Sequence, residues 1–274
     1  LHYPIRRQRQ MCIRDSSCGI FADKETTLEQ ASIAKYDRII EQLDIKEGQT
    51  VLEIGCGWGG FAQRLLETTG AKWTGTTISK EQHSYTLRQI EKGGFKERAT
   101  LLQEDYRTLQ GSYDRVVSIE MIEAVGHEYL PTYFSKISHL LAADGAALVQ
   151  AITMPDHRYD QYLTEVDYIR TRVFPGSCVP SVSAMISAVA KKSDLRPTGV
   201  QDIGYHYART LREWRLRFLK NEEAIKSLGY DDSFRRAWIY YLCYCEAGFE
   251  EGYTGDIHLL LTKPNCKVGK GFTQ

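Results

Sequence analysis

Long apolar runs are missing from this sequence. No stretch of its 274 residues approaches the roughly 20 consecutive apolar residues of a membrane-spanning helix, and no apolar signal-peptide core follows the basic N-terminus. A net charge is also missing, because 35 basic residues balance 35 acidic ones, and a general attraction to nucleic acid is therefore not expected. We predict a soluble, cytoplasmic protein whose contact with membranes is local and peripheral.

The cysteines lack the paired spacing of a metal site. Their number, seven, is odd, and only Cys243 and Cys245 lie close together in the sequence. His157 lies near two acidic residues, Asp156 and Asp160, but no further ligand follows at a suitable spacing. We therefore expect reduced thiols and no metal.

What the sequence does contain is a glycine turn after an apolar segment, Val51-Leu-Glu-Ile-Gly-Cys-Gly-Trp-Gly-Gly60. The apolar residues suit a buried parallel strand, and glycines at 55, 57 and 59 let backbone N–H groups approach a ligand where the next helix begins. Three interpretations compete: the E-x-G-x-G-x-G turn of S-adenosylmethionine (SAM) methyltransferases starting at Glu53, the G-x-G-x-x-G turn of dinucleotide-binding proteins, and a tight turn without a ligand.

The second strand favours SAM among these interpretations. A nicotinamide site has an acidic residue at the end of that strand, about twenty residues after the glycine turn, where the acid holds the ribose. Here the segment ends Gly75-Thr-Thr-Ile-Ser79, with no acid. We therefore expect SAM as the cofactor.

The order of the helix and strand patterns predicts a doubly wound, Rossmann-like α/β domain over residues 17–265. A capping box at Thr27–Gln30 begins a first helix that runs to about Leu43. The patterns then alternate as a parallel sheet requires, with strands expected at 50–54, 72–76, 99–103, 113–119 and 145–151 and helices near 60–69, 80–92 and 130–141.

Three segments depart from this alternation. Residues 1–16 are expected to carry no evolved function, because Met11–Ser16 matches what a common transposase sequencing adapter encodes when it is read in frame. Residues 154–200 are dense in turn signals and predict a helical lid inserted over the site. Residues 266–274 are expected to form a tail, after helical patterns near 181–193, 210–221 and 232–248 and a last strand at 256–262.

Several motifs follow one another in a fixed order: Ser17-Cys-Gly-Ile-Phe21, Ala34-Lys35, Thr77-Ile-Ser-Lys-Glu-Gln82, Asp105-Tyr-Arg107, Ser118-Ile-Glu-Met-Ile-Glu-Ala-Val-Gly126, Phe174-Pro-Gly-Ser-Cys-Val-Pro-Ser181 and Tyr207-Ala-Arg-Thr-Leu211. With the glycine turn, they resemble the family of cyclopropane-fatty-acyl-phospholipid synthases and mycolic acid cyclopropane synthases, from Ser17 to about Lys263. The resemblance implies methyl transfer from SAM to a cis double bond of an unsaturated phospholipid acyl chain. It is compatible with a homodimer.

The resemblance also implies a mechanism. A carbon–carbon double bond is a weak nucleophile, so the enzyme must place it beside the sulfonium methyl and exclude water that would quench the resulting carbocation. In the family, a bound bicarbonate then removes a proton and the cyclopropane ring closes. The positions that match the bicarbonate site are Cys18, Glu123, Ile152 and Tyr207.

On the cofactor side, the resemblance assigns residues from three turns. Glu53, Gly55, Gly57 and Gly59 would surround the methionine and ribose, Thr77 and Gln82 would lie near the ribose, and Asp105 and Tyr106 would contact the adenine. Structural roles remain open for some of the matched residues. Cys18 and Tyr207 would suit core packing, Glu123 a helix N-terminus, and Gln82 a capping box with Ser79.

Two positions depart from the family pattern. The chain has Gln150-Ala-Ile152 where the family commonly has His-x-Ile, and Ala124 replaces a histidine after the glutamate. Gln150 can still donate a hydrogen bond to bicarbonate but cannot titrate. The product could therefore be a cyclopropane, a methylene-branched or methyl-branched chain, or an alcohol formed by water.

The acyl site is the least defined part of the sequence. Phe234, Trp238, Tyr241 and Cys245 share one helical face that would line a lipid tunnel or belong to the core. Basic residues from Arg209 to Lys220 would face phospholipid headgroups or solvent. Two other functions stay open: an N-methyltransferase for small amines, and a non-catalytic lipid-binding relative.

Overall fold

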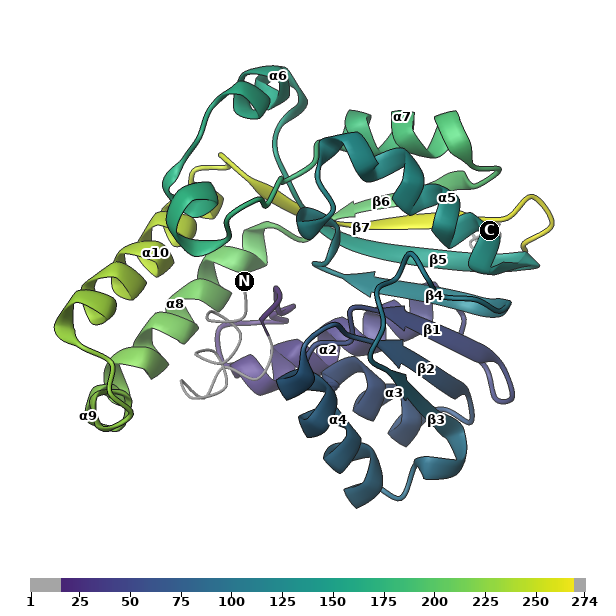
Figure 1. Cartoon of the computed structure of the whole chain (residues 1–274), viewed down its shortest axis with the longest axis horizontal. Helices are drawn as coiled ribbons and strands as arrows, with labels where there is room; N and C mark the ends of the chain where they lie inside the picture. The colour runs from purple at the N-terminus through teal and green to yellow at the C-terminus, as the bar shows by residue number, and fades with distance from the viewer. Residues whose placement is uncertain (1–15, 269–274) are drawn as a thin grey trace.

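A seven-stranded sheet runs through the centre of the protein (Figure 1). The computed structural model describes residues 16–268. The strand order is β3-β2-β1-β4-β5-β7-β6; the first five strands in the chain are parallel, and β7 is antiparallel to both of its neighbours. This confirms the Rossmann-like α/β class. The strands are β1 (Thr50–Ile54), β2 (Lys72–Thr76), β3 (Ala99–Leu102), β4 (Tyr113–Ile119), β5 (Leu141–Thr153), β6 (Arg196–Asp202) and β7 (Gly255–Thr262).

Helices cover both faces of the sheet because the central strands are apolar on both sides. Val51 and Val117 pack with α2 (Leu28–Gln42), α3 (Gly60–Thr68) and α4 (Lys80–Lys92). Leu52 and Val116 point the other way and pack with α5 (Leu130–Leu140) and α7 (Val182–Lys192). Successive residues of β1 and β4 are therefore buried on opposite faces, and the glycine turn that follows β1 lies between two packed layers.

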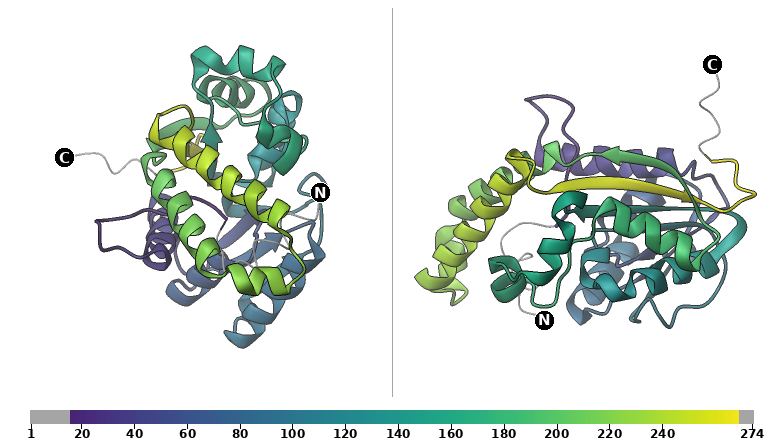
Figure 2. Two further views of the ribbon diagram at one scale, coloured as in Figure 1. Left: turned by 90° about the vertical axis from the view of Figure 1, so that its left-hand side faces the viewer. Right: turned by 90° about the horizontal axis from the view of Figure 1, so that it is seen from above.

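A third cluster lies beyond the edge at which the parallel strands end. It consists of α8 (Tyr205–Lys220) and α10 (Asp232–Glu250), which pack side by side, together with the short α9 (Glu222–Ser227) (Figures 1 and 2). Residues 18–21 pack against α8 in the same cluster. These elements wall the side of the molecule on which a doubly wound sheet carries its ligand.

The segment for which the sequence predicts a helical lid, residues 154–200, contains elements of two kinds. Residues 154–200 contain α6 (Asp156–Thr164), a π-helical turn, η4 (Ile169–Val173), and then α7 and the first part of β6. Of these elements, α7 packs on the sheet and β6 is one of its strands. β6 is not among the predicted strands, because Pro197 and Gly199 interrupt its local strand pattern. The structure accommodates them at the edge of the sheet, where the pairing with β7 shifts register.

The chain ends and the short turns complete the fold. Cys266 and Val268, expected in a tail, are buried against the core, whereas the proposed adapter segment 1–16 lies outside the described residues except for Ser16. The capping box of Thr27 and Gln30 is present at the start of α2.

Among residues 16–268, no helix is both long and apolar enough to span a bilayer. The remaining turns are η1 (Lys96–Arg98), η2 (Ile122–Ala124) and η3 (His127–Tyr129).

Candidate active site

The glycine turn adopts a backbone shape that other residues avoid. Gly55, Gly57 and Gly59 have φ angles of +80°, +52° and +79°, in the left-handed region. A Cβ at Gly59 would lie 2.7 Å from Cγ2 of Thr86 on α4, whereas a Cβ at Gly57 would meet no protein atom within 4 Å. Gly59 therefore serves helix packing, and Gly57 leaves open space for a ligand.

The other predicted cofactor residues surround the same turn, at the carboxyl ends of β1, β2 and β3. Glu53 accepts a hydrogen bond from Nε1 of Trp73 at 2.9 Å. Thr77 donates to Oε1 of Gln82 at 2.7 Å, so the Gln82 side chain bonds to Thr77, while its backbone N–H caps onto Ser79. Together with Asp105 and Tyr106, these residues line one cavity with Gly55 and Gly57.

Glu123 lies in η2, directly after β4, and its carboxyl group is buried. Oε1 accepts the backbone N–H of Ile152 at 2.7 Å, and Oε2 has no hydrogen-bond partner among the described residues. Burial, reinforced by the nearby negative charge of Glu120, raises the pKa of Glu123 to about 8. A buried carboxyl oxygen without a protein partner is available to a ligand.

Glu120, which the sequence analysis did not single out, is the centre of a hydrogen-bond network. Its Oε1 accepts from the backbone N–H of Cys18 and from Nε2 of Gln150, both at 2.8 Å, and its Oε2 accepts from the hydroxyl of Tyr207 at 2.5 Å. Gln150 uses its other N–H to reach Oδ2 of Asp256 at 2.8 Å. The network thus joins residues from the N-terminal segment, β5, α8 and β7.

Three carboxyl groups, those of Glu120, Glu123 and Asp256, gather at this edge of the sheet. Asp256 is fully buried, and the loss of solvation, followed by the negative charge of Glu120, raises its pKa well above the usual range. Burial, reinforced by the negative charge of Glu120, therefore favours the protonated forms of Glu123 and Asp256. Three donors meet at Glu120, and hydrogen bonds of this kind favour the ionised form of a carboxyl group.

The sequence contained a signal for Glu120 but not for Asp256. Glu120 directly follows a buried strand, the position at which parallel sheets present functional side chains. Its φ of +46° is unusual for a residue with a Cβ. Asp256 reaches the same edge only because β7 runs antiparallel, which pairs Asp256 with Ile152. Strand direction is a property of the assembled sheet.

A cavity of about 1490 Å³ connects the glycine turn to the carboxyl cluster and to α10. The cavity is lined by three of the positions that match the bicarbonate site, Glu123, Ile152 and Tyr207. Glu120 and Ala124 also line it. Cys18 and Gln150 do not line it, although both were predicted at the catalytic site. They lie behind Glu120 and hold its carboxylate from the protein side.

The chain matches the model of the family described as mycolic acid cyclopropane synthetase over residues 11–259. It belongs to this family. It is 38% identical over 244 residues to a tuberculostearic acid methyltransferase of Mycobacterium tuberculosis, covering 86% of this chain and 57% of that protein. It is also 30% identical over 259 residues to cyclopropane mycolic acid synthase 3 of Mycobacterium tuberculosis, covering 90% and 88%.

Solved structures agree with this family membership. The crystal structure of a mycolic acid cyclopropane synthase complexed with SAH and CTAB superposes with a TM-score of 0.86 at 27% identity, covering 96% of each chain. This family member therefore has the fold of the SAM-dependent methyltransferases. It spans little more than half the length of the tuberculostearic acid methyltransferase.

The predicted acyl-lining face of α10 divides in two in this family member. Tyr241 and Cys245 line the cavity, together with Phe249 one turn further along. Phe234 packs against Phe218 of α8 instead, with ring centroids 6.4 Å apart. The C-terminal half of α10 therefore contributes to the cavity, and its N-terminal half to the α8–α10 core.

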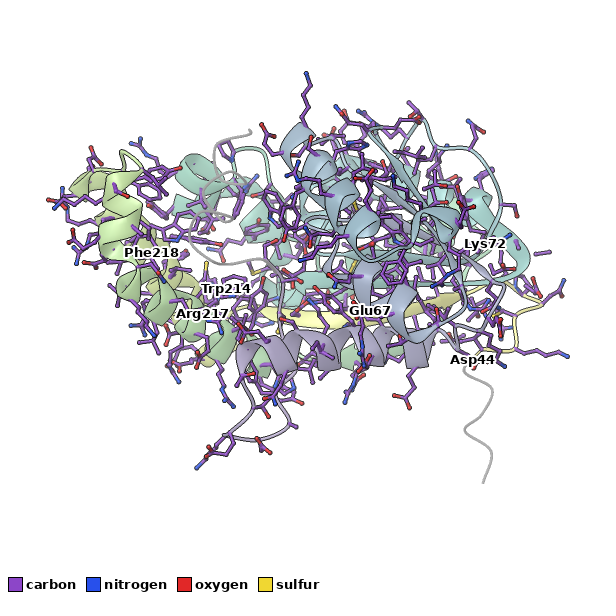
Figure 3. All side chains as sticks on the ribbon, turned by 90° about the horizontal axis from the view of Figure 1, so that it is seen from below. Asp44, Glu67, Lys72, Trp214, Arg217 and Phe218 are labelled. Carbon is purple, nitrogen blue, oxygen red and sulfur yellow. The ribbon has the colours of Figure 1, made fainter. Side chains whose placement is uncertain are left out.

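The basic face of α8 is paired within the protein. Arg212 and Arg215 bind Glu246 of α10 at 2.8 and 3.0 Å, and Arg217 binds Glu29 of α2 at 2.5 Å. Figure 3 labels Arg217 together with two buried aromatic residues of this helix, Trp214 and Phe218. These ion pairs fasten α8 to α10 and to α2.

The raised pKa of Glu123 predicts a pH-dependent stability. A carboxyl group whose pKa rises from 4.5 to about 8 on folding disfavours the folded state progressively as the pH rises through that interval. Glu123→Gln lacks this effect. The free energy of unfolding of Glu123→Gln minus that of the wild type should therefore be larger at pH 8 than at pH 5. The increase should be about 2 kcal/mol or more, since one pKa unit corresponds to about 1.4 kcal/mol.

Urea unfolding at the two pH values measures this difference. Glu128→Gln is the matched control, because Glu128 lies in the same loop and is exposed. The control should follow the wild type at both pH values. If the free energies of unfolding of Glu123→Gln and the wild type differ by the same amount at pH 5 and pH 8, Glu123 is already ionised at pH 5.

Proposed function

We propose that the protein transfers the methyl group of SAM to the double bond of an unsaturated fatty acyl chain. The observation that carries the proposal is the cavity, which joins the open space at Gly57 to a compartment lined by aromatic residues of the lid, α8 and α10. An acyl chain needs such an apolar compartment, and a carbocation needs one that excludes water. The aromatic residues are Phe174, Tyr207, Tyr241, Tyr244 and Phe249.

SAM, when bound, supplies an electrophilic methyl group, and residues at the ends of three strands would hold it. The backbone at Gly55 and Gly57 would approach the methionine part, and Thr77 and Gln82 the ribose. Asp105 and Tyr106 would contact the adenine. Glu123 would turn its unpartnered Oε2 toward the reacting end of the acyl chain and stabilise positive charge there.

We further propose that the acyl chain belongs to a phospholipid and enters from a membrane surface. Exposed apolar and aromatic side chains lie between α6 and η4, in the middle of α10 and just after α10. Val166 is 68% exposed, Tyr240 53% and Tyr253 43%, and Tyr253 also lines the cavity. Such a patch favours peripheral contact with a bilayer.

The product is proposed to carry one added CH₂, as a cyclopropane ring or as a methylene branch. The similarity to a tuberculostearic acid methyltransferase supports a branched product, and the similarity to cyclopropane mycolic acid synthases supports a ring. Both products have the same mass, so fragmentation or hydrogenation must distinguish them.

A substitution at Cys245 tests whether the cavity holds the acyl chain. Cys245 lines the cavity, whereas Cys243, on the same helix, is exposed. Cys245→Trp should fill the compartment and reduce methyl incorporation into vesicles of a cis-unsaturated phospholipid by at least tenfold, with unchanged SAM affinity. Cys243→Trp should behave as the wild type.

The same assay separates the competing functions. Labelled methyl from SAM is offered to vesicles of the cis-unsaturated phospholipid, to vesicles of its saturated counterpart, and to a panel of small amines. We expect transfer only to the unsaturated lipid. Transfer to an amine, unaffected by Cys245→Trp, would replace this proposal with N-methylation, and binding of lipid without any transfer would indicate a non-catalytic role.

A further inference from the structure

The groups that the family resemblance assigns to bicarbonate are hydrogen-bonded to carboxyl groups of the protein itself. Ile152 gives its N–H to Glu123 at 2.7 Å. Glu120 accepts from all the others, at 2.5 to 2.8 Å: the Cys18 N–H, the Gln150 amide and the Tyr207 hydroxyl. A bicarbonate ion would have to displace the Glu120 carboxylate to reach these donors. The residues present therefore do not fit bicarbonate.

We infer that the carboxylate of Glu120 takes the place of bicarbonate and is the base that removes the proton from the methylated acyl chain. This inference rests on the proposed function and names its base. A carboxylate and a bicarbonate ion share the same planar pair of oxygen atoms, and the same donors can hold either one. Because the Glu120 carboxylate is part of the protein, the reaction needs no bicarbonate in addition to SAM.

The position of Glu120 suits this role. Glu120 lines the cavity, whereas Cys18 and Gln150, which donate to its carboxylate, do not. Its backbone N–H donates to the Gln150 carbonyl at 2.9 Å and helps to hold the left-handed φ of +46°. Backbone strain of this kind persists where the surrounding structure enforces it, and it is concentrated at functional sites.

The surrounding charges also suit a base at this position. Three donors stabilise the negative charge of Glu120. Glu123 and Asp256, whose pKa values are raised by burial and by Glu120, avoid adding further charge. The site therefore holds one anchored carboxylate in an apolar cavity, where it can also stabilise a carbocation.

Proton removal follows the transfer of the methyl group. Addition of the methyl group to the double bond leaves a carbocation on the chain. A C–H bond of the transferred methyl group breaks, and its electron pair bonds to the cationic carbon and closes the ring. If a 1,2-hydride shift first moves the cation to the carbon that carries the methyl group, the same electron pair forms a methylene double bond instead. The proton forms an O–H bond on Glu120, and it passes to solvent after the product leaves.

Removing the carboxylate should create the bicarbonate requirement that the wild type lacks. In CO₂-free buffer, with SAM and cis-unsaturated phospholipid vesicles, the wild-type rate should not change when bicarbonate is added. Glu120→Gly, which suits the left-handed backbone and vacates the donors, should lose about a hundredfold in rate and recover at least tenfold with millimolar bicarbonate. Glu120→Gln keeps the volume but cannot take the proton, and bicarbonate should not rescue it.

Binding of ¹³C-labelled bicarbonate, followed by NMR, gives a readout that does not depend on turnover. Glu120→Gly should bind the ion, and the wild type and Glu120→Gln should not; unchanged SAM affinity of each variant reports a folded protein. Bicarbonate binding to the wild type, a wild-type rate that falls without it, or a Glu120→Gln rate above a tenth of the wild-type rate would each overturn the inference. A wild type that methylates no unsaturated lipid would instead overturn the proposed function.

Discussion

Glu123→Gln should lower the turnover by about a hundredfold or more and change the SAM affinity by less than tenfold. In the ligand-free protein, burial keeps Glu123 largely protonated near neutral pH, since its pKa is raised to about 8. A cation in the cavity lowers the pKa of a neighbouring carboxyl group and favours the ionised form. Glutamine cannot supply this negative charge to a carbocation, and a positioned electrostatic group contributes on this scale.

Single-turnover measurement of methyl transfer to unsaturated phospholipid, with separate calorimetric titration of SAM, checks this expectation. Glu128→Gln changes the charge of the same loop at an exposed position and should leave both quantities unchanged. If Glu123→Gln turns over within threefold of the wild type, η2 has a structural role, and its loop does not take part in the reaction.

Gly57→Val should weaken SAM binding by at least a hundredfold. A Cβ at this position would meet no protein atom within 4 Å, and Gly57 lines the cavity, so the valine side chain would occupy space proposed for the cofactor. The φ of +52° adds backbone strain of about 1–2 kcal/mol, which lowers stability without unfolding the chain.

Gly48→Val separates these two effects. Gly48 also has a left-handed φ, +79°, and open space at its Cβ, but it is exposed and does not line the cavity. Both variants should lose similar thermal stability, and only Gly57→Val should lose SAM affinity in a calorimetric titration. Equal SAM affinity in the two variants would contradict the placement of the cofactor at the glycine turn.

The role of Gln150, which departs from the family pattern, is determined by the two carboxyl groups beside it. As a sequence position it lacks the titratable ring of histidine, which suggests a weakened base site. In the structure its amide donates both to Glu120 and to Asp256, and an amide nitrogen has two hydrogen atoms for this purpose. The substitution is therefore consistent with a site arranged around a protein carboxylate.

Local patterns were sufficient for most of the strands and helices and for the glycine turn. Apolar residues before Gly55, and the capping box of Thr27 and Gln30, act over a few neighbouring residues, so they can be recognised without knowledge of the fold. β6 was missed because Pro197 and Gly199 weaken the local preference for a strand, and only pairing with β7 makes this segment one. Pairing of that kind depends on contacts distant in sequence.

The proposed base was decided by tertiary structure. Cys18 and Glu120 are separated by 102 positions, and Gln150 and Asp256 by 106, yet each pair is joined by a hydrogen bond of 2.8 Å. The motifs identify which residues belong to the site but not which carboxyl group each donor reaches. That choice depends on the left-handed backbone at Glu120 and on the antiparallel direction of β7, and both arise only when the layers of the sheet and the helix α8 come together.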